Sequence, residues 1–184
     1  MLCTVPGGRT LQRRLFIVGP CGIGKTTLSS LIESRFGLPH LDFDQYRRAA
    51  PADSPACTLS RLDLPLCLAP FLAGHQDGYV IDFGGDTVFR RTVQDNDRRL
   101  QQIRQLKHEQ GIEVALLDGN EDAVRSRFLS CKSRGPEEFD GPWKDWSEIG
   151  RPWWGQCADR VVDTTGARLE DETGMIALAE TILG

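Results

Sequence analysis

Apolar residues gather in five short runs that predict the strands of a β-sheet. Each run is brief, and the first, RLFIV, stops at a glycine, as a strand buried in a parallel sheet does. The runs cover residues 14–18, 39–43, 79–83, 112–117 and 160–164.

Helical patterns lie between these runs. After Lys25, apolar residues recur at helical spacing up to Phe36, and Gly37 is placed to end the helix. Further helices are predicted at 59–73 (broken or kinked by its prolines), 89–109, 121–132 and 175–183, with irregular stretches at 49–57 and 133–150. The alternation predicts an α/β fold, a three-layer sandwich around a five-stranded parallel sheet.

Composition narrows the function classes. The 184 residues fit one domain, 1–184, and 40% are hydrophobic and 26% charged. The net charge of −4 gives no reason to expect a nucleic acid or an anionic membrane surface as partner. No run reaches the ~20 apolar residues of a membrane span, and the apolar run after the basic start is too brief for a signal peptide. We expect a cytoplasmic protein, a monomer or weak homodimer, with reduced cysteines.

A phosphate-binding motif follows the first predicted strand. Residues 19–26, GPCGIGKT, fit the pattern GxxxxGK[ST] and stand between a strand and a helix, the context that the motif requires. Its glycines let backbone N–H groups surround phosphates, its lysine reaches the β- and γ-phosphates, and its hydroxyl binds Mg²⁺. We therefore predict ATP and Mg²⁺ as cofactors, bound by Gly19, Cys21, Gly22, Ile23, Gly24, Lys25, Thr26 and Thr27.

The remaining sequence favours a compact kinase over other nucleotide-binding proteins. No lysine is followed by the residues of a guanine-reading NKxD motif, and the chain is short for a motor or remodelling ATPase. A kinase needs an acceptor site, and we expect it within about residues 44–78.

Two aspartates follow the second predicted strand, in LDFD. Carboxyl ends of strands face the ligand crevice in such sheets, and alternate strand residues share a face. Asp42 and Asp44 could therefore point the same way, one orienting or deprotonating an acceptor hydroxyl and the other holding Mg²⁺. Helix capping by these aspartates is the structural alternative.

The third predicted strand ends in DFGGD. Asp82 stands where a carboxylate could bind the metal's water shell, and Gly84 and Gly85 would allow a substrate close to the backbone. Asp86 is a further candidate for substrate contact, with helix capping as the alternative.

A basic helix leads into a Gly/Pro segment and predicts a mobile lid over about residues 127–150. Closing a lid excludes water, which would otherwise accept the phosphoryl group, and a lid arginine could stabilise developing charge. Arg127 and Arg134 are the candidates. The four tryptophans of residues 143–154 are expected mainly to pack this segment onto the core.

With these motifs in hand, the chain resembles the shikimate kinase family nearly end to end. The resemblance rests on the phosphate loop, the Asp42-x-Asp44 pair, the glycine pair and the tail RPWWGQCADRVVDT from Arg151. It implies that Asp44 binds the acceptor hydroxyl, that Arg127 lies at the adenine face and that Arg151 contacts the substrate or the transferred phosphate.

Two departures from the family bear on the acceptor. The family has a third glycine where this chain has Asp86, and an Arg that grips the shikimate carboxylate where this chain offers only Arg61. An acidic residue there would repel a carboxylate. We therefore expect a kinase acting on a hydroxyl- or amine-rich small molecule, such as a polyol, cyclitol or sugar. A nucleoside or nucleoside monophosphate kinase, and a non-catalytic ATP-binding sensor, remain as alternatives.

Overall fold

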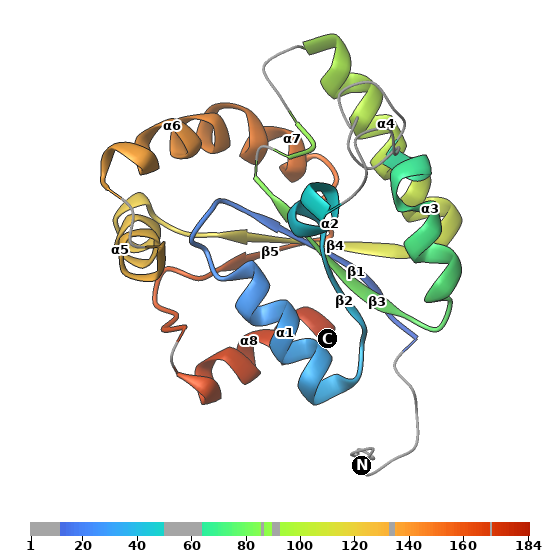
Figure 1. Cartoon of the computed structure of the whole chain (residues 1–184), viewed down its shortest axis with the longest axis horizontal. Helices are drawn as coiled ribbons and strands as arrows, with labels where there is room; N and C mark the ends of the chain where they lie inside the picture. Colours follow the sequence, from blue (N-terminus) through green and yellow to red (C-terminus); the bar gives the residue numbers. More distant parts are fainter. Residues whose placement is uncertain (1–11, 50–63, 86, 90–92, 133–134, 170) are drawn as a thin grey trace.

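Five parallel strands form one sheet in the order β2-β3-β1-β4-β5 (Figure 1). The structure is a computed structural model that describes residues 12–49, 64–85, 87–89, 93–132, 135–169 and 171–184. The strands are β1 Arg14–Gly19, β2 His40–Asp42, β3 Tyr79–Gly84, β4 Ile112–Asp118 and β5 Arg160–Asp163. The predicted α/β fold with a five-stranded parallel sheet is confirmed.

The central strand β1 is buried on both faces because its side chains alternate between two hydrophobic clusters. Leu15 and Ile17 belong to one cluster, and Phe16 and Val18 to the other. Helices α1 (Lys25–Phe36), α5 (Glu121–Lys132) and α8 (Glu172–Leu183) cover the first face, and α3 (Leu64–Gly74), α4 (Val93–Gln110) and α7 (Arg151–Gly155) cover the second (Figure 1).

The prediction of an irregular stretch at 133–150 is wrong for residues 137–150. Helix α6 (Glu137–Asp145) leads into a π-helical turn, η2 (Trp146–Gly150), and then directly into α7. Trp146 and Trp154 are fully buried, and a Cβ on Gly150 would lie 2.6 Å from the Trp146 ring. Gly150, one of the glycines that suggested a loop, therefore permits close packing here. The expected packing role of these two tryptophans is confirmed.

A second correction concerns the segment after β2. The strand ends at Asp42, and residues Phe43–Ala49 form a short helix, α2, which the sequence pattern did not predict. Asp44 thus lies in the first turn of a helix, and the argument from alternating strand residues was wrong for it. The helix forms because Phe43 anchors it in the core and the Asp42 carboxylate caps it by accepting the N–H of Gln45 at 2.8 Å.

Part of the predicted helix at 59–73, together with Arg61, lies outside the described residues. The described part of that region, α3, contains Pro70 in its interior. Among the described residues, no helix is both long and apolar enough to cross a membrane. Among the described residues, Cys21, Cys67 and Cys157 are free thiols, and the reduced state of the six cysteines stays a prediction.

Candidate active site

The loop between β1 and α1 has the backbone of an anion-binding turn. Gly22 and Gly24 have φ values of 86° and 100°, which side chains rarely tolerate. Gly24 is the N-cap of α1, whose first N–H groups and positive dipole end face the loop. The structure thus forms the predicted turn at the carboxyl end of the central strand.

Neighbouring residues also lie close to both glycines. A Cβ on Gly22 would lie 2.9 Å from the Phe128 Cβ of α5, and one on Gly24 would lie 2.4 Å from the Leu169 Cδ2. Helix α5 and the segment after β5 therefore enclose the loop from outside.

Lys25 and Thr26 have different environments. Lys25 is buried, and its Nζ donates hydrogen bonds at 2.9 Å to the carbonyl oxygens of Gly19 and Pro20. Thr26 is exposed. The loop therefore carries an ammonium group close to its own backbone and a hydroxyl that is open to solvent.

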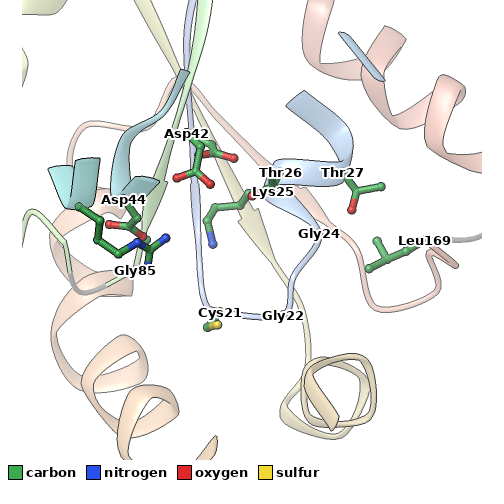
Figure 2. A pocket seen from close by; sticks show the side chains of 13 residues that line it. Cys21, Gly22, Gly24, Lys25, Thr26, Thr27, Asp42, Asp44, Gly85 and Leu169 are labelled. Atoms are coloured by element: carbon green, nitrogen blue, oxygen red, sulfur yellow. The ribbon is translucent and has the colours of Figure 1, made fainter. Parts of the chain in front are cut away.

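A cavity of about 450 Å³ lies against this loop (Figure 2). This volume is in the range of small-molecule sites. In the close-up, Asp44 and Gly85 lie on one side of Lys25, Thr27 and Leu169 lie on the other, and Asp42 lies next to Lys25 (Figure 2). Its lining consists of Cys21, Gly22, Gly24, Lys25, Thr26, Thr27, Asp42, Asp44, Arg48, Asp82, Gly84, Gly85 and Leu169.

Asp44 is held by a hydrogen bond from a residue that the sequence did not single out. The Thr87 hydroxyl donates to the Asp44 Oδ1 at 2.6 Å, and Thr87 is buried in the turn after β3. Asp42 lines the same cavity while capping α2, so the structural alternative considered for it is present too.

The glycine pair is needed by the protein itself. A Cβ on Gly84 would lie 2.4 Å from the Asp44 Oδ2, and one on Gly85 would lie 2.7 Å from the Trp146 ring. Both glycines line the cavity, so backbone contact with a substrate stays a prediction.

Asp82 lies on the strand next to Asp42, in register with it. It is buried, with its side chain 4% exposed, and its Oδ2 lies 3.3 Å from the His40 Nε2. Within the described residues, neither of these two atoms has a hydrogen-bond partner. Two carboxylates from neighbouring strands offer the oxygen ligands that a cation such as Mg²⁺ takes.

Arg127 and Arg151, two of the predicted arginines, do not line the cavity. Arg151 pairs with Asp118 at the carboxyl end of β4, the strand next to β1. The Arg127 Nε donates to the Ala123 carbonyl, and its Nη1 lies 3.4 Å from the Thr164 hydroxyl. Asp86 and Arg134 lie outside the described residues, so their predicted roles have no structural counterpart here.

Sequence reasoning missed two residues of the cavity wall. Arg48 follows Asp44 by one helical turn, a spacing that would have been visible had α2 been predicted. Leu169 is an apolar residue in an irregular segment, and no pattern distinguishes it. Four predicted site residues are absent from the lining: Gly19, Ile23, Arg127 and Arg151.

Comparisons with known proteins extend the description of the fold. No family model and no curated protein matches the chain. Among solved structures, a shikimate kinase from Bacteroides thetaiotaomicron superposes with a TM-score of 0.60 at 17% identity, covering 92% of this chain and 95% of its own.

Two further structures align over similar lengths. An uncharacterized protein from Eubacterium ventriosum gives a TM-score of 0.57 at 11% identity, covering 93% of this chain and 98% of its own. A sugar kinase from Janibacter sp. gives 0.51 at 14% identity, with 94% of each chain covered. The chain shares its fold with these solved structures. At these identities the likeness concerns the fold, and the chemistry must be argued from the site.

Proposed function

We propose that the chain is an ATP-dependent kinase that transfers the γ-phosphate to a hydroxyl group of a small metabolite. One observation carries the proposal: the carboxylates of Asp42 and Asp44 line the same cavity as Lys25 and Thr26. A phosphate loop occurs in many classes of nucleotide-binding protein. A carboxylate in the same small cavity adds a group that can activate an acceptor hydroxyl.

The two ends of the cavity suit the two substrates. Leu169 and Thr27 form the side away from Asp44 (Figure 2). Leu169 offers an apolar surface to the nucleotide, whose phosphates would then run along the loop toward Asp44. Arg127, on α5 outside the loop, keeps its proposed place at the adenine face.

The residues present fit a magnesium ion. Mg²⁺ prefers oxygen ligands and is usually held by one or two carboxylates together with substrate phosphates. Thr26, Asp42 and Asp82 supply such oxygens around the cavity. Within the described residues no group of three His, Cys, Asp or Glu side chains could hold a metal alone, so the phosphates would complete the coordination. When bound, the ion would neutralise charge on the phosphates.

Asp44 is suited to act as the general base. Its Oδ1 is fixed by Thr87, which leaves Oδ2 to take the proton of the acceptor hydroxyl. The hydroxyl oxygen would then bond to the γ-phosphorus as the bond to the ADP oxygen breaks. Lys25 would stabilise the phosphates, and Arg151 is the proposed partner of the transferred group, reached by leaving Asp118.

Arg48 favours one alternative in particular. Its exposed guanidinium adds positive charge to the wall that carries Asp44, and it would suit an acceptor with a phosphate. A nucleoside monophosphate kinase would use the site in that way. The acceptor screen below therefore includes nucleotides.

The proposal is tested by ADP release from Mg·ATP over a panel of hydroxylated metabolites. The panel contains polyols, cyclitols, sugars, hydroxy acids, nucleosides and nucleoside monophosphates. We expect one group of acceptors to raise the rate and Lys25→Met to abolish that increase, because Met fills the same space without the charge. Lys144→Met, an exposed lysine of α6, is the matched control and should behave as wild type.

Two results would contradict the proposal. Unchanged turnover in the Lys25→Met variant would remove the loop from the chemistry. Tight ATP binding with no acceptor-dependent ADP release across the whole panel would favour a non-catalytic sensor.

A further inference from the structure

His40 and Asp82 form a buried pair at the wall of the cavity. Their side chains are 9% and 4% exposed, and the His40 Nε2 lies 3.3 Å from the Asp82 Oδ2. Among the described residues, both atoms lack any hydrogen-bond partner. Burying a carboxylate oxygen without a donor is costly, and the His40 imidazole lies within ion-pair distance of this oxygen.

The sheet places the pair beside the proposed metal ligands. Asp42 and Asp82 are register partners on β2 and β3, and His40 precedes Asp42 by two residues on the same strand. Side chains two apart share a face, so all three belong to one face of the sheet. The N–H of His40 is held at 3.1 Å by the Glu33 carboxylate of α1, which fixes the start of β2 under the phosphate-loop helix.

The contact with His40 gives the two carboxylate oxygens of Asp82 different surroundings. Oδ2 is buried against His40, while the residue still lines the cavity. With Oδ2 against His40, Oδ1 would be the oxygen that faces the cavity. A carboxylate held through one oxygen presents the other in a fixed direction, which is what a weakly bound, geometrically demanding ion requires.

We propose that His40 is a positioning residue that holds the Asp82 carboxylate for Mg²⁺. The inference rests on the proposed nucleotide site. It differs from a purely structural role, because it predicts an effect on the metal-dependent part of nucleotide binding and none on the metal-free part.

The test is calorimetric titration of ADP with and without Mg²⁺. In the wild type we expect Mg²⁺ to strengthen ADP binding. His40→Leu should reduce this strengthening about tenfold, the lower end of what outer-shell partners of metal ligands contribute, with metal-free ADP affinity unchanged. His40→Gln keeps an N–H donor at the position of Nε2 and should retain most of the strengthening. His108→Leu, an exposed histidine of α4, is the control.

The possible outcomes separate the two proposals. If the wild type binds no ADP at all, the proposed function fails, and the role of His40 with it. If the wild type shows the Mg²⁺ effect and His40→Leu shows the same effect, only the positioning role is overturned. If His40→Leu does not fold, His40→Asn, whose shorter amide falls short of Asp82, takes its place with the same expectation.

Discussion

Gly84 is the residue at which a single methyl group would most directly disturb the proposed acceptor side. Its added Cβ would lie 2.4 Å from the Asp44 Oδ2 and 2.6 Å from the Thr87 Oγ1. Asp44 is the proposed base, and the Thr87 hydroxyl fixes it by donating a hydrogen bond to its carboxylate. The glycine is thus explained by the protein's own packing, whether or not a substrate also approaches it.

Gly84→Ala should therefore lower acceptor-dependent ADP release while leaving the affinity for Mg·ADP near that of the wild type. Overpacking of this kind costs about 1–3 kcal/mol of stability, which thermal unfolding would register. Gly155→Ala is the control, since a Cβ there meets no atom within 4 Å. Equal loss of nucleotide affinity and turnover would mean that Asp44 has no separate acceptor role.

At the scale of elements, the helical segment from α6 to α7 packs tightly against Gly85 of the site. A Cβ on Gly150 would lie 2.6 Å from the Gly85 carbonyl oxygen, and Gly85 lines the cavity. The π-helical turn therefore rests against the backbone of the acceptor side.

Gly150→Ala should push this turn away and destabilise the fold by about 1–3 kcal/mol. Gly141→Ala, inside α6 with nothing within 4 Å of the new Cβ, should instead stabilise it by about 0.5–1 kcal/mol, because alanine favours helix. Both are measured as shifts in denaturant unfolding. A neutral Gly150→Ala would show that η2 can move from Gly85 at little cost.

The elements also show where sequence patterns succeed and where they fail. Strands and long helices were predictable because buried runs and helical spacing repeat over many residues, and Gly37 ends α1 with φ 73° as expected. The short helix α2 was not predicted, because its seven residues are too few to show a helical periodicity. The α6–α7 segment was missed because its glycines and prolines suggest a loop, while the burial of its tryptophans is a tertiary effect.

The candidate site also has a part that local sequence predicts and a part that depends on the tertiary fold. The loop at residues 19–26 is local in sequence, so its glycine turn was predictable from the motif. Arg48, Thr87 and His40 reach the site only through the placement of α2, β2 and β3, which no spacing along the chain reveals. The pairing of Arg151 with Asp118 likewise joins residues 33 positions apart.

For the whole molecule, the sheet order explains why the candidate site residues lie together at the carboxyl ends of the strands. Strands β2, β3 and β4 all end beside the loop that follows the central strand β1. Asp42, Asp82 and Asp118 are at or near those ends, and α1 directs its N-terminus at the same place. Ligands of open α/β sheets bind at the carboxyl ends of the strands, which agrees with the position of the cavity.

The most direct test of this account is a crystal structure of the chain with Mg²⁺ and a non-hydrolysable ATP analogue. We predict phosphates enclosed by the backbone N–H groups of residues 19–26, with the ion between Thr26 and the Asp42–Asp82 pair and the γ-phosphate directed toward Asp44. An analogue bound elsewhere, or a loop that stays empty at saturating analogue, would contradict the account.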